Sequence, residues 1–225
     1  MSGVRVEVLR VFTDEEGRYG NLLGIVQGSD VAVADRQRAA VAIGFSETVF
    51  VDDAEEGRIQ IFTPAMELPF AGHPTVGTAW WLRQQGFTAD RLVVPAGTIE
   101  VSRRGDLTHV LARIHWTNRF TWHQLNSPSD VEAADPSSYT EGRHYVWAWS
   151  DLDRGAVRSR MFAPFLGIVE DQATGAAAVG LTGKLGRDLD ITQGQGSRLF
   201  STLEAEGWAS VGGRVVAESA RVISV

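Results

Sequence analysis

A short internal repeat relates the two halves of the chain. In each copy an apolar strand pattern ends at Phe-x-Pro, an acidic residue follows, and a glycine opens a helix pattern with a second glycine five residues on. The offset between the copies is 100 residues at the phenylalanine and the proline and 103 at the acidic residue and the two glycines, which a three-residue insertion reconciles. An internal repeat indicates duplicated structural units. The sequence therefore predicts two lobes of like topology that face each other. The matching positions are Phe62, Pro64, Glu67, Gly72 and Gly77 in the first copy and Phe162, Pro164, Glu170, Gly175 and Gly180 in the second.

The length and composition are compatible with two such lobes. A chain of 225 residues that is 44% hydrophobic and 22% charged has enough apolar material for a sizeable core. We expect an N-terminal lobe over residues 1–105 and a C-terminal lobe over residues 106–212. Residues 213–225 alternate like a terminal hairpin, which could return to the N-terminal lobe.

Hydrophobic periodicity predicts the individual elements. Period-two patterns predict strands over residues 4–12, 22–26, 47–51, 58–62, 110–114, 145–149 and 157–162, and a hairpin over 92–101. Helices are predicted over residues 29–43, 75–85 and 174–181, and a connecting loop over 126–142.

Charge and motif content exclude several classes of function. The net charge is -7 and no basic run interrupts it, which argues against a nucleic-acid partner. The absence of cysteine removes disulfides, thiolate nucleophiles and thiol-based metal sites, and the histidines lack metal-ligand spacing, so we expect no metal. No phosphate-binding or dinucleotide-binding glycine loop occurs. The start of the chain is charged and no apolar stretch reaches membrane-spanning length, so we expect no membrane association and a cytoplasmic location.

Two predicted helix starts offer a place for an anion. Gly72 and His73 stand at the first helix start, and Thr174 and Gly175 stand at the second. A helix N-terminus presents free N–H groups and a partial positive charge. Two such termini from opposite lobes could together hold one carboxylate.

Three titratable residues lie next to these helix starts. Glu47 stands where a helix gives way to an apolar strand, so that loss of hydration would raise its pKa toward neutrality and suit it to proton transfer. His73 could shuttle a proton or bond to a substrate oxygen, and Asp171 could orient substrate or transfer a proton. Structural roles remain open for all three: Glu47 as a strand flank, His73 as a loop histidine and Asp171 as a helix cap.

The chain resembles the phenazine-biosynthesis PhzF-like isomerase family, relatives of diaminopimelate epimerase. The block from Thr63-Pro64 through Glu67-Leu68-Pro69-Phe70-Ala71-Gly72-His73-Pro74-Thr75 to Gly77 is the most specific match. Further matches, in the family's order, are Gly20-Asn21, Gly44-Phe45-Ser46-Glu47-Thr48-Val49-Phe50, Glu170-Asp171 with Ala173-Thr174-Gly175, and Gln193-Gly194.

The resemblance implies a fold, a reaction and a set of site residues. It implies an α+β fold of two pseudo-symmetric lobes, each a curved, mostly antiparallel sheet wrapped around a central helix, with the active site between them. It implies a cofactor-independent isomerase or epimerase that shifts a proton in a small carboxylate-bearing substrate, with Glu47 as the acid/base, and a homodimer. The implied catalytic residues are Glu47, His73 and Asp171, and the implied substrate-binding residues are Asn21, Gly72, Thr75, Thr174, Gly175 and Ala176.

Ala176 stands where the family commonly has serine, and the chain is shorter than typical members. A small-molecule-binding member of the same family without catalysis is therefore the alternative hypothesis. A hydrolase with Ser46 as nucleophile would need a nearby histidine and oxyanion donors that the sequence does not place.

Overall fold

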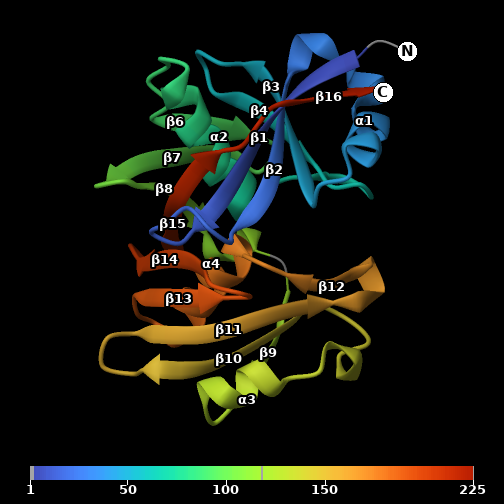
Figure 1. Ribbon diagram of the computed structural model, residues 1–225. Helices are drawn as coiled ribbons and strands as arrows, with labels where there is room; N and C mark the ends of the chain where they lie inside the picture. The colour runs from blue at the N-terminus through green and yellow to red at the C-terminus, as the bar shows by residue number, and fades with distance from the viewer. Residues whose placement is uncertain (1–2, 118, 225) are drawn as a thin grey trace.

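The computed structural model describes residues 3–117 and 119–224 and shows two lobes, one above the other in Figure 1. Each lobe wraps a strongly curved sheet around a central helix, α2 (Gly72–Gln84) in the first and α4 (Gly175–Leu185) in the second. The predicted α+β fold class is confirmed. The first lobe contains β1 (Gly3–Thr13), β2 (Asn21–Gln27), α1 (Arg36–Ile43), β3 (Glu47–Asp53), β4 (Arg58–Phe62), β5 (Glu67–Leu68), β6 (Arg91–Val94), β7 (Gly97–Arg104) and β8 (Leu107–Arg113). The later elements are β9 (Thr121–Gln124), α3 (Pro128–Ala133), β10 (His144–Asp151), β11 (Ala156–Ala163), β12 (Ile168–Asp171), β13 (Leu189–Gln193), β14 (Ser197–Leu203), β15 (Trp208–Ala217) and β16 (Arg221–Ser224).

The two lobes repeat one order of strand pairing. Parallel pairs β2–β3 and β4–β6 in the first lobe match parallel pairs β9–β10 and β11–β13 in the second. Antiparallel pairs β3–β4, β4–β5 and β6–β7 match β10–β11, β11–β12 and β13–β14. The short sequence repeat is therefore part of a duplicated sheet.

The central helices are buried because the repeat places small residues where strands approach them. Val76 and Val179 are completely buried in one continuous hydrophobic core. At Gly77 a Cβ atom would lie 2.5 Å from a Leu23 methyl group, and at Gly180 it would lie 3.1 Å from the Trp122 ring. The second glycine of each copy thus lets strand side chains pack directly on the helix backbone.

Strand β15 connects the two sheets. It pairs with β14 and β8 through its first part and with β1 through its end. Leu9 lies opposite Ala217 and Val6 lies opposite Arg221, so the segments expected to form a terminal hairpin instead follow one another along β1. The hairpin prediction is wrong because both segments complete the edge of the first sheet.

Three other element predictions need correction. The helix expected over residues 29–43 begins only at Arg36, because Val31 takes an extended conformation that buries its side chain against the first sheet. The loop expected over residues 126–142 contains α3, whose start is capped by Ser127. Five strands lie where no strand is predicted, namely β5, β9, β12, β13 and β14. Among residues 3–117 and 119–224, no helix is long and apolar enough to cross a membrane.

Candidate active site

A cavity of about 110 Å³ lies where the N-termini of α2 and α4 meet. It brings together seven residues singled out from the sequence, with an apolar wall contributed by both lobes. The polar and helix-start lining consists of Glu47, Thr63, Gly72, His73, Arg143, Asp171, Thr174, Gly175 and Ala176, and the apolar lining includes Leu68, Phe70, Phe120, Met161 and Ile168.

Glu47 reaches the cavity from the first residue of β3. The preceding helix α1 ends at Gly44, whose φ of 73° turns the chain into the strand. The Glu47 side chain is 18% exposed, its Oε2 lies 3.5 Å from His73 Nδ1, and Oε2 has no hydrogen-bond partner among the described residues. Burial raises the pKa of Glu47 to about 7, outweighing a hydrogen bond from Ser46. Glu47 can therefore both accept and donate a proton near neutral pH.

His73 is the second residue of α2 and is buried. Burial lowers the pKa of His73 to about 4, although the negative charge of Asp171 acts in the opposite direction. The imidazole is neutral at pH 7, so its contact with Glu47 is not an ion pair. A neutral imidazole can donate from one ring nitrogen and accept at the other.

Asp171 ends β12 and faces the cavity from the second lobe. Its Oδ1 accepts a hydrogen bond of 2.5 Å from Asn21 Nδ2, and its Oδ2 accepts one of 2.5 Å from the Thr174 hydroxyl. Burial and the neighbouring Glu47 raise the pKa of Asp171 to about 6, against the opposing effect of these hydrogen bonds. Asn21, which belongs to the first lobe, thus helps to fix a carboxyl group of the second.

The two helix starts meet at glycines. A Cβ atom built on Gly72 would lie 2.9 Å from the Cα of Gly175, closer than real Cβ contacts allow. Neither helix start has a side-chain cap, so the first N–H groups of both helices point toward the same region. The positive ends of both helix dipoles face this region, which makes it favourable for an anion.

Three residues differ in role from what the sequence suggests. Asn21, expected to bind substrate, does not line the cavity and instead bonds to Asp171. Thr75 is completely buried, and its hydroxyl bonds to the carbonyls of Ala71 and Gly72, so it holds the first turn of α2 and does not line the cavity. The sequence presents Gln193 only as part of the matching pair Gln193-Gly194. Its amide donates to the Asp171 carbonyl and the Thr174 hydroxyl, and its Oε1 accepts from the Thr174 N–H.

Gln193 is supported by Tyr145, which no sequence signal singles out. Both side chains are completely buried, and the Tyr145 hydroxyl donates to Gln193 Oε1 at 3.2 Å and bonds to the Ser159 hydroxyl at 2.8 Å. This buried network fixes the segment that carries Asp171.

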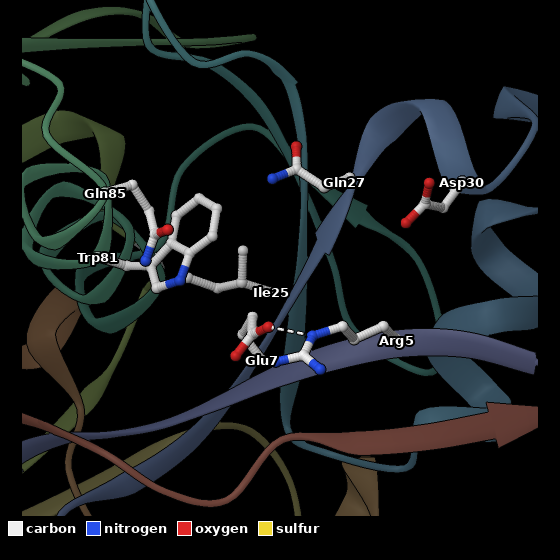
Figure 2. A pocket seen from close by; sticks show the side chains of 7 residues that line it. All are labelled: Arg5, Glu7, Ile25, Gln27, Asp30, Trp81 and Gln85. Carbon is white, nitrogen blue, oxygen red and sulfur yellow. Dashed lines mark hydrogen bonds and ion pairs between the residues drawn. The ribbon is translucent and has the colours of Figure 1, made fainter.

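A larger hollow of about 260 Å³ lies on the first lobe between β1, β2 and the end of α2. Figure 2 shows its lining, with an ion pair of 2.6 Å between Arg5 and Glu7. None of the residues predicted to act on substrate lines it, and its only close charge pair is satisfied internally. The smaller cavity is therefore the candidate active site. The hollow is lined by Arg5, Glu7, Ile25, Gln27, Asp30, Trp81 and Gln85.

Comparison with known proteins gives matches along most of the chain. Residues 9–138 and 123–207 match the family described as phenazine biosynthesis-like protein. A trans-2,3-dihydro-3-hydroxyanthranilate isomerase of Pseudomonas aeruginosa is 31% identical, in an alignment that covers 89% of this chain and 86% of the relative. The isomerase of the same name from Pseudomonas fluorescens is also 31% identical, in an alignment that covers 78% of this chain and 77% of that relative.

Solved structures show the same fold at lower identity. A PhzF-family phenazine biosynthesis protein from Enterococcus faecalis superposes with a TM-score of 0.80 at 20% identity and covers 100% of both chains. A hydroxyproline epimerase from Agrobacterium vitis gives a TM-score of 0.63 at 11% identity, covering 99% of this chain and 93% of its own. With the sequence matches along both lobes, these findings establish that the chain belongs to the phenazine biosynthesis-like PhzF family of isomerases.

Proposed function

We propose that this isomerase shifts a proton within a small carboxylate-bearing substrate, with Glu47 as the acid/base. The observation that carries the proposal is the buried Oε2 of Glu47, which has no hydrogen-bond partner among the described residues and belongs to a carboxyl group with a pKa of about 7. Such a group takes a proton from carbon in one step and returns it in the next. Because the oxidation state of the substrate does not change, the reaction consumes no redox cofactor.

The paired helix starts support the binding of the substrate's negative charge. The N–H groups at Gly72, His73, Gly175 and Ala176 would hold the carboxylate or the charge that develops when the proton leaves. His73, neutral and 3.5 Å from Glu47, would hydrogen-bond to a substrate oxygen or pass on the proton. Asp171, positioned by Asn21 and Thr174, would orient a polar group of the substrate or act as a second proton carrier.

The names of the relatives suggest which substrate to test first. The Pseudomonas enzymes that match along most of this chain are isomerases of trans-2,3-dihydro-3-hydroxyanthranilate, which bears a carboxylate. The apolar wall around Phe70 and Phe120 would suit the ring of such a compound. We therefore propose it as the first candidate, ahead of the substrates of the epimerase structures.

Deuterium uptake tests the proposal directly. The protein is incubated in D₂O with trans-2,3-dihydro-3-hydroxyanthranilate and with a panel of small carboxylates, and deuterium in the recovered compounds is measured by mass spectrometry. We expect uptake by the wild-type protein, near-complete loss with Glu47→Gln, and unchanged uptake with the control Glu55→Gln in the exposed turn after β3. Undiminished uptake by Glu47→Gln would exclude Glu47 as the acid/base. Binding without exchange by the wild-type protein would identify the non-catalytic alternative.

A further inference from the structure

The strand registers give Glu47 a counterpart in the second lobe. In the first lobe Thr48 lies opposite Phe62, and in the second lobe His144 lies opposite Phe162. Phe62 and Phe162 are equivalent positions of the sequence repeat. Thr48 and His144 are therefore equivalent, and the residue before each of them, Glu47 and Arg143, is also an equivalent pair.

Each of the two positions also lies at the start of a strand that has a parallel neighbour. Glu47 lies beside Leu23 of β2, where β2 and β3 run parallel. In the second lobe the residue that follows Arg143, His144, lies beside Thr121 of the parallel strand β9. The Arg143 carbonyl accepts a hydrogen bond of 2.7 Å from the Thr121 N–H, so the backbone at this position is fixed.

Both members of the pair line the same cavity, but their charges differ in sign. Of the described residues that line it, Arg143 carries the one permanent positive charge, since His73 is neutral at pH 7. Glu47 and Asp171 supply two carboxyl groups to the same space, and the whole chain carries a net charge of -7. An anionic substrate must therefore find a local positive charge to enter.

The Arg143 guanidinium is not used by the protein itself. Within residues 3–117 and 119–224 it makes no hydrogen bond or ion pair, whereas Arg158 and Arg160 of the neighbouring β11 bond to Glu132 and Glu170. No ion pair within 4 Å joins Arg143 to Glu47 or Asp171 in the described structure. The Arg143 guanidinium and the Glu47 carboxyl are not paired with each other, so each can contact a ligand in the cavity.

We propose that Arg143 binds the anionic group of the substrate and makes the site select acids over their neutral analogues. That the bound anion is the substrate rests on the proposed function. A guanidinium group presents a planar fork of N–H donors that matches a carboxylate in two parallel hydrogen bonds. It has no acceptor, so it gains little from a carboxamide of the same shape.

The experiment compares benzoate with benzamide, two rings of like size that differ in charge. Affinities are measured by isothermal titration calorimetry for the wild-type protein, Arg143→Gln, Arg143→Lys and the control Arg58→Gln. Arg58 is exposed on β4, outside the cavity, and its substitution changes the net charge equally. Thermal melting of each variant verifies that it is folded.

We expect the wild-type protein and Arg58→Gln to prefer benzoate. Arg143→Gln should lose roughly tenfold to a hundredfold in benzoate affinity and change benzamide affinity little, which removes the preference. Arg143→Lys should retain part of the preference, because it keeps the charge but not the fork.

A full preference for benzoate in folded Arg143→Gln would overturn the proposal and assign the anion to the helix starts alone. No preference in the wild-type protein would overturn it as well. The proposed function fails on a different measurement, namely undiminished deuterium uptake by Glu47→Gln. A loss of acid preference in Arg143→Gln together with that uptake would leave the assignment of Arg143 standing.

Discussion

Gly72 and Gly175, the first residues of α2 and α4, are packed backbone against backbone at the centre of the molecule. A Cβ on Gly72 would lie 2.9 Å from the Cα of Gly175, and a Cβ on Gly175 would lie 3.0 Å from the Cα of Gly72. The obstructing atoms are backbone atoms, which cannot rotate away. Glycine at both positions is therefore what lets two helix N-termini serve one cavity.

Replacing either glycine by alanine should separate the helix starts. We expect Gly72→Ala and Gly175→Ala each to lower the free energy of unfolding by about 1–3 kcal/mol and to weaken benzoate binding. Both substitutions strain the same contact, and moving the helix starts apart relieves it for both. The double variant should therefore lose less free energy of unfolding than the sum of the two single losses. Urea unfolding and calorimetry measure both effects. Additive losses would show that the two sites are independent.

Glu47→Gln should make the stability less dependent on pH. The folded protein holds the Glu47 proton more tightly than the unfolded chain, since its pKa rises from 4.5 to about 7. Raising the pH from about 4.5 through 7 therefore lowers the free energy of unfolding of the wild-type protein. Glutamine avoids the buried charge, so the variant should gain up to about 3 kcal/mol relative to wild type above about pH 8, and nothing below about pH 4.

Denaturant unfolding across this pH range measures the difference. The control Glu55→Gln, at an exposed position, should follow the wild-type curve. Asp171 contributes in the same direction between its usual pKa of 3.8 and about 6. His73 contributes in the opposite direction, because its pKa falls from 6.5 to about 4 and stability rises with pH between those values. Parallel curves for wild type and Glu47→Gln would contradict the raised pKa of Glu47.

Gln193→Leu should destabilise the protein through the segment that carries Asp171. It removes the partners of the Asp171 carbonyl and of the Thr174 N–H and hydroxyl in a buried region. We expect a loss of about 2–4 kcal/mol, compared with about 1 kcal/mol for Tyr145→Phe, which removes only the supporting hydroxyl. Urea unfolding gives the comparison. Equal, small losses would mean that the network does not act as a unit.

Ala176→Ser should strengthen the binding of a carboxylate. Ala176 lines the cavity at the second residue of α4 and is the repeat counterpart of His73. A hydroxyl there would add a hydrogen-bond donor beside the helix N–H groups, worth roughly threefold to tenfold in benzoate affinity. Ala176→Val fills similar space without a donor and should weaken binding. A higher benzoate affinity for Ala176→Val than for Ala176→Ser, measured by calorimetry, would contradict a donor role at this position.

The sequence predicts a position best where the local structure admits a single type of residue. Gly72 and Gly175 could be found because a repeated helix start requires a small residue. The place of Glu47 beside an apolar strand makes it a candidate, but a strand-flanking role stays equally open from the residues alone, and only the resemblance to the PhzF-like family implies an acid/base. The loop signal at Ser127 was misleading, since serine followed by proline also begins a helix, and here it begins α3.

Arg143 and Tyr145 could not be found from local patterns. The role proposed for Arg143 depends on the alignment of two strand registers that only the folded sheets define. Tyr145 is one of several aromatic residues in an apolar strand, and its hydroxyl partner Gln193 lies on another strand. Val31 shows the same limit, because burial against the sheet overrides its place in a helix pattern.

The pairing of β1 with β15 and β16 also determines when the molecule can fold during its synthesis. Leu9 needs Ala217 as its strand neighbour, and Val6 needs Arg221. A ribosome releases these partners only after nearly all of the second lobe has been made, so the first lobe keeps an open sheet edge during that time. Contacts between such distant parts of a chain close slowly. The edge of the first sheet at β1 therefore stays unpaired in the nascent protein until β15 and β16 have emerged.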